Sequence, residues 1–227
     1  SKADLADPEL TAEYLHYFTE KKIEAIALDA RTKKANTQIM KALSKITKEK
    51  KERDQKRGIR NRPVRAMICG IPNVGKSTFI NSLSGRSSAK TGNKPGVTKG
   101  KQWISFAGME LLDTPGILWP KFEDQLVGIR LACVGSIKDD ILNMEELALW
   151  LIEHLRTNYK GLLEKRYGVS EEGTAVEVLG AVAKARGCLK KGEELDYVKA
   201  SGLLFDDFRG GKIGRVTLEW PEQEKNE

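Results

Sequence analysis

Residues 70–77 carry the clearest chemical pattern in this chain. They read Gly-Ile-Pro-Asn-Val-Gly-Lys-Ser, which is the G-x-x-x-x-G-K-[ST] pattern of a phosphate-binding loop. In such a loop, backbone N–H groups point at nucleotide phosphates, Lys76 reaches the β- and γ-phosphates, and the Ser77 hydroxyl holds Mg²⁺. The pattern predicts nucleotide binding. The alternative is a glycine-rich turn that binds nothing.

The neighbouring sequence supports the nucleotide-binding interpretation. The apolar run 64–69 indicates a strand that leads into the loop, and the run 77–83 indicates a helix that leaves it. A strand, a loop and a helix in this order are typical of an α/β fold. The loop residues expected to contact the nucleotide are Asn73, Val74, Gly75, Lys76, Ser77 and Thr78.

Two later segments could hold the metal ion and contact the γ-phosphate. Residues 113–116 read Asp-Thr-Pro-Gly and follow the apolar run 109–112. Asp113 would hold Mg²⁺ through water, and the N–H of Gly116 would contact the γ-phosphate. Thr98 would add a second hydroxyl to Mg²⁺ when the γ-phosphate is present. We predict catalytic roles for Lys76, Thr98 and Gly116.

The residues that could read a base come at the start of the chain. Residues 1–4 read Ser-Lys-Ala-Asp, so Lys2 and Asp4 are the candidates in this segment. The Asp4 carboxylate could accept two hydrogen bonds from guanine, a pair that adenine does not offer. Asp29 and Ala30 fit the segment whose backbone N–H meets the guanine O6. Base-reading segments usually follow the D-x-x-G segment, so this order indicates a circularly permuted GTP-binding domain.

In this order, the motifs resemble those of the circularly permuted GTPases of the YlqF type, the ribosome biogenesis GTPase A family. The likeness extends to Arg-Gly-Cys-Leu at 186–189 and to the stretch 206–214. It implies a P-loop G-domain, with a mostly parallel sheet flanked by helices, followed by a small all-helical domain. It also implies a role in late assembly of the bacterial large ribosomal subunit. We expect the G-domain at 1–120 and the helical domain at 121–227.

Two departures from the family pattern bear on the site. The family's base motif begins with Asn where this chain has Ser1, and a hydroxyl cannot both brace the loop and contact the purine as an amide does. We therefore expect either weakened guanine affinity or a boundary at Ser1. The resemblance also implies upstream residues that supply further strands and a histidine proposed to act in hydrolysis, so we expect the chain to be incomplete.

The position that often orients the attacking water is not polar in this chain. Many GTPases have a glutamine directly after D-x-x-G, whereas this chain has Ile117, which cannot hydrogen-bond a water. Asn73 resembles the asparagine of K⁺-dependent GTPases, whose carbonyl oxygen helps to hold a potassium ion beside the phosphates. The alternative is that Asn73 only braces the loop. We expect slow intrinsic turnover that a partner accelerates.

Charge is concentrated in the segment 41–65, which connects the two sets of motifs. It holds 11 basic and 3 acidic residues in a chain of net charge +7. This excess favours contact with an RNA backbone; the alternative is a solvated helix. No apolar run is long enough to cross a bilayer, and the three cysteines fit neither zinc nor a disulfide framework. We expect no signal peptide. We expect a cytoplasmic location and a buried Cys69.

The C-terminal part shows helix signals at three places. Asn143 and Asp196 are candidate N-caps, and Thr174 with Glu177 forms a candidate capping box. The last stretch, 213–220, alternates weakly and is expected to be extended.

Three functions fit these observations. The first is a GTP-hydrolysing assembly factor that is stimulated by the large ribosomal subunit, with GTP or GDP, Mg²⁺ and K⁺ as ligands. The second is a nucleotide-regulated switch that binds a protein partner. The third is a non-ribosomal P-loop NTPase, such as an ATPase, which the serine at position 1 keeps open. For the first function we expect ribosomal RNA as partner, neither DNA nor a membrane, and a monomer.

Overall fold

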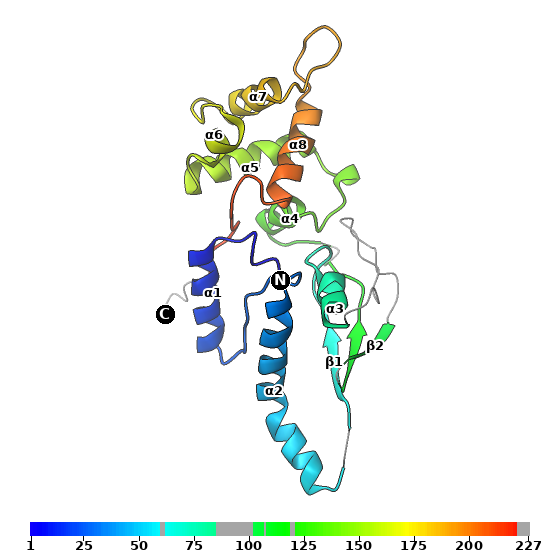
Figure 1. Cartoon of the computed structure of the whole chain (residues 1–227). Coiled ribbons are helices and arrows are strands. Elements are labelled where there is room, and N and C mark those ends of the chain that lie inside the picture. The colour runs from blue at the N-terminus through cyan, green and yellow to red at the C-terminus, as the bar shows by residue number, and fades with distance from the viewer. Residues whose placement is uncertain (60–61, 85–101, 107, 119–120, 222–227) are drawn as a thin grey trace. The chain divides into compact units, whose positions relative to one another are not determined.

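The computed structural model of the chain describes residues 1–59, 62–84, 102–106, 108–118 and 121–221 (Figure 1). The chain forms two compact units. The first contains Ser1–Asp4, Pro8–Pro120 and Pro221–Glu227, and the second contains Leu5–Asp7 and Lys121–Trp220. Among the described residues, no helix is long and apolar enough to cross a membrane.

The first unit contains a small mixed sheet. Strand β1 (Val64–Ile68) pairs in parallel with β3 (Met109–Asp113), and β2 (Gln102–Phe106) pairs with β3 in the antiparallel sense. The expected strands at 64–69 and 109–112 are thus confirmed. The expectation of a mostly parallel sheet is wrong for β2. The connection from β2 to β3 is too short for a crossover and turns at Gly108 (φ 76°), so the two strands must run in opposite directions.

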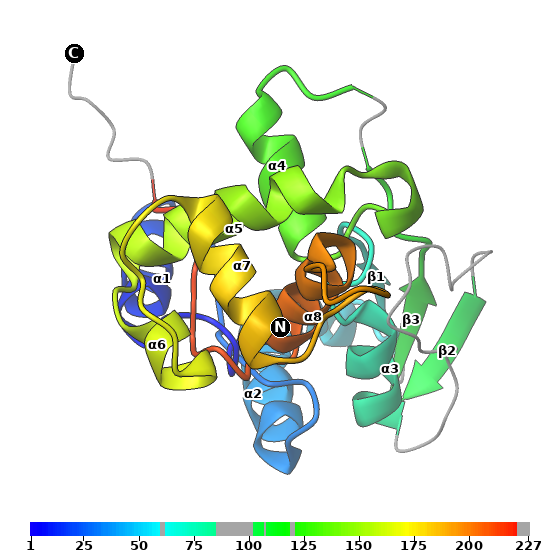
Figure 2. The same cartoon turned by 90° about the horizontal axis from the view of Figure 1, so that it is seen from above.

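Helices of the first unit cover one face of this sheet. Ala66, Leu111 and Ile104 are register partners across β1, β3 and β2, so their side chains share a face. That face packs against apolar side chains of α2 (Lys33–Lys56) and α3 (Lys76–Ser84). Figure 2 shows α3 alongside β3 and β2. The α/β class predicted for this part of the chain is therefore confirmed. Helix α1 (Pro8–Glu20) also belongs to this unit.

The opposite face of the sheet is exposed in the described part of the unit. Met67 is 63% exposed and Trp103 is 55% exposed, and the Arg65 guanidinium lies 5.6 Å from the centre of the Trp103 ring. Cys69 continues the alternation of Arg65 and Met67 and is also exposed. The expectation that Cys69 is buried was therefore wrong.

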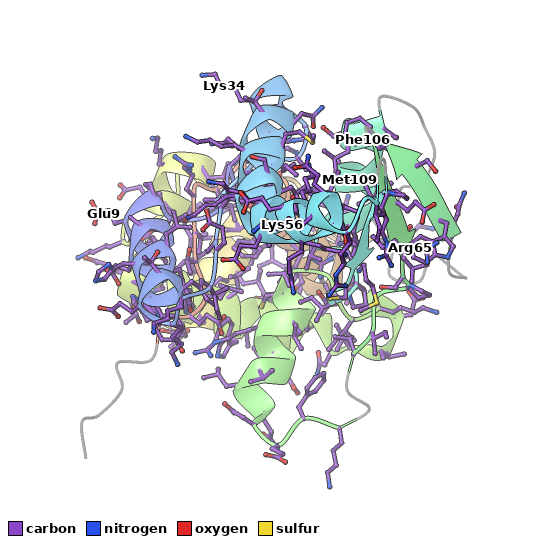
Figure 3. All side chains as sticks on the ribbon, turned by 90° about the horizontal axis from the view of Figure 1, so that it is seen from below. Glu9, Lys34, Lys56, Arg65, Phe106 and Met109 are labelled. Atoms are coloured by element: carbon purple, nitrogen blue, oxygen red, sulfur yellow. The ribbon has the colours of Figure 1, made fainter. Side chains whose placement is uncertain are left out.

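Helix α2 changes character along its length. Its first half packs Ala35 and Ile39 into the core of the unit, where they are 1% and 4% exposed. Further along, Ile46 is 60% exposed, so the packed apolar face of the helix ends before this residue. The second half is polar and mostly exposed as far as Lys56, which Figure 3 labels at the end of the helix; Thr47 is its one buried residue.

The second unit is helical around one core. Its elements are α4 (Gln125–Cys133), a 3₁₀ turn η1 (Asp139–Ile141), α5 (Met144–Asn158), α6 (Leu162–Tyr167), α7 (Ala175–Ala185) and α8 (Tyr197–Arg209). The three predicted N-caps are confirmed: Asn143, Thr174 and Asp196 each accept a hydrogen bond from the backbone N–H three residues on. Residues 213–220 form neither a helix nor a strand, and the N–H of Val216 donates to the carbonyl oxygen of Leu5 at 2.9 Å.

Candidate nucleotide site

The phosphate loop joins β1 to α3 in the predicted strand–loop–helix order. Three of its residues have positive φ angles: Gly70 at 149°, Asn73 at 59° and Gly75 at 92°. L-amino acids rarely adopt such angles, and glycine does so without steric cost. A Cβ added to Gly75 would lie 2.8 Å from the Ser1 hydroxyl oxygen. The loop is thus curled as phosphate binding requires, and Ser1 packs closely against it.

Lys76 is the first residue of α3 and folds back over the loop. Its Nζ donates hydrogen bonds to the carbonyl oxygens of Gly70 (3.0 Å) and Ile71 (2.7 Å). Burial lowers the pKa of Lys76, and the nearby charges of Asp113 and Cys69 oppose that shift. The ammonium therefore lies over the cradle, where nucleotide phosphates would compete with two carbonyl oxygens for its protons.

Asp113 ends β3 opposite Ile68, the last residue of β1. It is 1% exposed, and among the described residues its Oδ1 is buried without a hydrogen-bond partner. Burial raises the pKa of Asp113, while Lys76 lowers it. The Thr114 hydroxyl donates to the Ile68 carbonyl oxygen at 2.7 Å and so ties the ends of the two strands together.

The chemistry of this carboxylate fits Mg²⁺. Mg²⁺ in phosphate-transfer sites usually takes one or two protein carboxylates and completes its shell with water and phosphate oxygens. Asp113 offers one buried oxygen without a partner. No group of three His, Cys, Asp or Glu residues that could hold a metal ion occurs in the described part of the chain. Asp113 and the Ser77 hydroxyl are therefore suited to a nucleotide-dependent ion.

Gly116 lies against the phosphate loop. A Cβ at this position would lie 2.6 Å from the Cα of Pro72 and 3.0 Å from Nζ of Lys76. No side chain fits there without moving backbone, so the D-x-x-G segment requires glycine for close approach. The following residue, Ile117, is 66% exposed and apolar.

The two segments predicted to read the base lie together, and the first contacts the phosphate loop. The N–H of Ala3 donates to the Leu28 carbonyl oxygen at 3.2 Å, which joins the first segment to the second. The Ser1 hydroxyl donates to the carbonyl oxygen of Val74 at 2.5 Å. Ser1 therefore braces the loop, which is one of the two tasks that the sequence analysis assigned to an amide at this position.

No contact was predicted for the side chain of Arg31, which directly follows Asp29 and Ala30 in the sequence. Its guanidinium donates from Nε and Nη2 to the two carboxylate oxygens of Asp29, each at 2.9 Å, and from Nη2 to Oδ2 of Asp4 at 2.5 Å. The Arg31 hydrogen bonds lower the pKa of Asp29. No local signal in the sequence could place residue 31 beside residue 4, because only the fold brings them together.

Most of the predicted site residues thus gather in the first unit. The phosphate loop, Asp113, Gly116, Asp4 and Asp29 are linked directly or through one neighbour. Lys2 has a positive φ of 61°, and Ala30 is buried in the core beside Leu28. Thr98 lies outside the described residues. The structure adds hydrogen bonds of Ser1, Arg31 and Thr114, and a close approach of Pro72 to Gly116, that sequence reasoning missed.

The class of this site follows from the loop geometry together with a family comparison. Residues 65–176 match a family model described as a 50S ribosome-binding GTPase. With its curled G-x-x-x-x-G-K-S loop and its buried D-x-x-G aspartate, the chain is a P-loop GTPase.

Comparison with curated relatives identifies the particular family. The chain is 48% identical to ribosome biogenesis GTPase A of Bacillus cereus over 98% of its length and 76% of the relative's, and 45% identical to that of Priestia megaterium over 98% and 78%. The crystal structure of GNP-bound YlqF from T. maritima has a TM-score of 0.66 and 28% identity, covering 98% of this chain and 80% of that one. A GDP-bound YlqF structure has a TM-score of 0.68, also at 28% identity, covering 98% and 82%. The chain belongs to the ribosome biogenesis GTPase A family.

Proposed function

We propose that this chain is an assembly factor for the large ribosomal subunit that binds and hydrolyses GTP, with slow intrinsic hydrolysis stimulated by the ribosomal particle. The observation that carries the nucleotide part is the Ser1–Val74 hydrogen bond, since it holds the base-reading segment against the phosphate loop. The relatives' name and the 50S ribosome-binding description support the ribosomal part.

Each site residue has a role in this proposal. Asp4 reads the guanine N1–H and amino group, with Lys2 beside it, and the N–H of Ala30, next to Asp29, meets the guanine O6. The backbone N–H groups from Asn73 to Thr78 hold the phosphates, and Lys76 neutralises the β- and γ-phosphates. The N–H of Gly116 contacts the γ-phosphate.

Metal ions complete the proposed site. Ser77, Thr98 and Asp113 would hold Mg²⁺, whose charge would offset the charge that develops on the phosphate oxygens. Because Ile117 has no hydrogen-bonding group, the chain needs another source of catalysis. Asn73, whose left-handed backbone is part of the loop, is a candidate ligand for K⁺. The ribosomal particle would supply or position the group that orients the attacking water.

The connecting segment supports a ribosomal RNA partner. Lys48, Lys50 and Lys51 are exposed on α2, and no ion pair joins them to another described residue. Cations of this kind bind phosphate backbones through charge alone. We propose that 1–120 forms the G-domain, that 121–227 forms the helical domain, and that the protein acts in the cytoplasm as a monomer without DNA or a membrane.

Changing Asp4 to Asn tests the base-reading assignment and separates it from the ATPase alternative. An asparagine amide can donate to the C2 carbonyl of xanthine but cannot accept the two guanine protons. We expect Asp4→Asn to lower affinity for GDP and raise affinity for XDP, by about ten-fold or more each, with affinity for ADP unchanged, measured by calorimetric titration. Unchanged selectivity would refute the assignment of Asp4. The exposed carboxylate change Asp206→Asn serves as a control.

A further inference from the structure

The Arg31 guanidinium resembles the guanine edge that the proposed function assigns to Asp4. Guanine would present two adjacent N–H donors to this carboxylate, and a guanidinium presents the same kind of planar donor pair. In the structure, Nη2 of Arg31 donates to Oδ2 of Asp4 at 2.5 Å. The other oxygen, Oδ1, is buried and has no hydrogen-bond partner among the described residues.

We propose that Arg31 is a gate residue, which binds the base-reading carboxylate of Asp4 whenever no base is bound and which guanine must displace. This inference rests on the proposed role of Asp4. Two-point recognition of guanine needs both carboxylate oxygens, and Arg31 already takes one of them. A base therefore enters only after the Arg31–Asp4 contact has opened.

Asp29 keeps the gate close to the site after it opens. It binds the same guanidinium through both carboxylate oxygens at 2.9 Å, and its Oδ1 also accepts the N–H of Arg31 at 3.0 Å. The guanidinium can therefore leave Asp4 while it stays on Asp29. When the nucleotide departs, Arg31 is in place to close on Asp4 again.

The exposure of the pair sets the size of the effect. The Arg31 side chain is 65% exposed and that of Asp4 is 26% exposed, so the contact is a partly screened surface ion pair. Pairs of this kind contribute modestly, which corresponds to a change of about two- to five-fold in an equilibrium constant. The gate therefore tunes the rate of nucleotide entry and does not block it.

Stopped-flow binding of fluorescent mant-GDP tests the gate. We expect Arg31→Ala to raise the association rate constant about two- to five-fold, because the site is open more of the time. The dissociation rate constant should stay the same, since the gate has already left Asp4 in the bound state. The difference from the unmodified chain should shrink at high salt, where exposed ion pairs are screened.

A matched control separates the gate from a general loss of charge. Arg65 is also exposed, at 71%, and pairs with Glu110 at 2.6 Å, but it lies on the exposed face of the sheet. Arg65→Ala removes the same charge and one ion pair, against two for Arg31→Ala, and should leave both rate constants unchanged. An unchanged association rate in Arg31→Ala, or a faster dissociation, would overturn the gate.

The Asp4→Asn background distinguishes failure of the gate from failure of the base site. An asparagine does not form an ion pair with Arg31, so Arg31→Ala should no longer change the association rate of mant-XDP in this background. If Asp4→Asn switches the base preference but Arg31→Ala has no effect in the unmodified chain, only the gate is wrong. If Asp4→Asn does not switch the preference, both proposals fall.

Discussion

Burial acts in opposite directions on the two charged side chains at the centre of the phosphate site. It lowers the pKa of Lys76 and raises that of Asp113, and the attraction between the two charges opposes both shifts. Each residue also has an interaction that a nucleotide would change: Lys76 donates to two loop carbonyls, and Asp113 has a buried oxygen without a partner among the described residues. Lys76 and Asp113 are therefore suited to hold an anion and a cation side by side.

The close approach of Gly116 to the phosphate loop predicts the effect of adding a side chain there. An added Cβ would overlap the Pro72 backbone at 2.6 Å and approach Lys76 Nζ at 3.0 Å. We expect Gly116→Ala to move the D-x-x-G segment off the loop and to lower GTP turnover by about ten-fold or more, as loss of one transition-state donor does. Steady-state phosphate release measures this.

The control for this change is Gly202→Ala. A Cβ at Gly202 meets nothing within 4 Å, so helix α8 should accept the alanine and turnover should be unaffected. Equal turnover in Gly116→Ala and the unmodified chain would show that the close approach of Gly116 to the phosphate loop is not needed for hydrolysis.

At the scale of elements, the two halves of α2 differ: one face of the first half is buried, and the second half carries exposed basic side chains. The first packs against the core, whereas Lys48, Lys50 and Lys51 are exposed. A helix this polar is not held by packing along its whole length, which leaves its second half available for a partner.

The triple change Lys48→Ala, Lys50→Ala, Lys51→Ala tests the exposed half of α2. Each lost phosphate contact lowers the slope of log affinity against log salt by about 0.7 to 0.9. We expect a drop in that slope of about 2 to 3 for large-subunit binding, measured by sedimentation over a salt series. The same slope in the triple variant would show that α2 does not contact RNA. Lys190→Ala, Lys191→Ala, Lys199→Ala makes an equal charge change in the second unit as control.

The buried carboxylate of Asp207 in α8 accepts hydrogen bonds from three side chains of the second unit. It is 3% exposed and accepts hydrogen bonds from Arg166 (2.8 Å), Tyr167 (3.2 Å) and Lys212 (3.0 Å). Burial raises the pKa of this carboxyl group, but the bonds from Arg166 and Lys212 outweigh it, so the net shift is downward.

We expect Asp207→Ala to lower the free energy of unfolding of this unit by about 2–3 kcal/mol. This is below the cost of breaking a fully buried pair, because Lys212 is 60% exposed. Urea unfolding followed by tryptophan fluorescence gives the value, with the exposed neighbour Asp206→Ala as control. Equal midpoints for the two variants would contradict the assignment of Asp207 as a stabilising centre.

Local signals predicted some elements of this fold and missed others. The N-caps at Asn143, Thr174 and Asp196 were predictable because a capping side chain bonds to its own helix. Strand β2 and helices α4 and α6 were missed, because such short runs form through tertiary packing. In the site, spacing located Lys76 and Asp113, whereas the contacts of Ser1 and Arg31 depend on residues far apart in sequence.

At the scale of the whole molecule, charge differs along the chain. Residues 41–65 hold 11 basic and 3 acidic side chains, and residues 121–227 hold 16 basic and 20 acidic ones. A net charge of +7 on the chain thus reflects a basic connecting segment and not a uniformly basic surface. Such a distribution favours an RNA contact through the first unit and steers association from a distance.

The central claim is that the ribosomal particle stimulates a GTPase that has Ile117 where many GTPases have a water-orienting glutamine. The most direct test is GTP turnover with and without large ribosomal subunits, in potassium and in sodium buffer. We predict slow turnover alone and at least about ten-fold stimulation by the subunit, with a further requirement for potassium if Asn73 holds that ion. Tight GTP binding without stimulation by the subunit in either buffer would contradict the account.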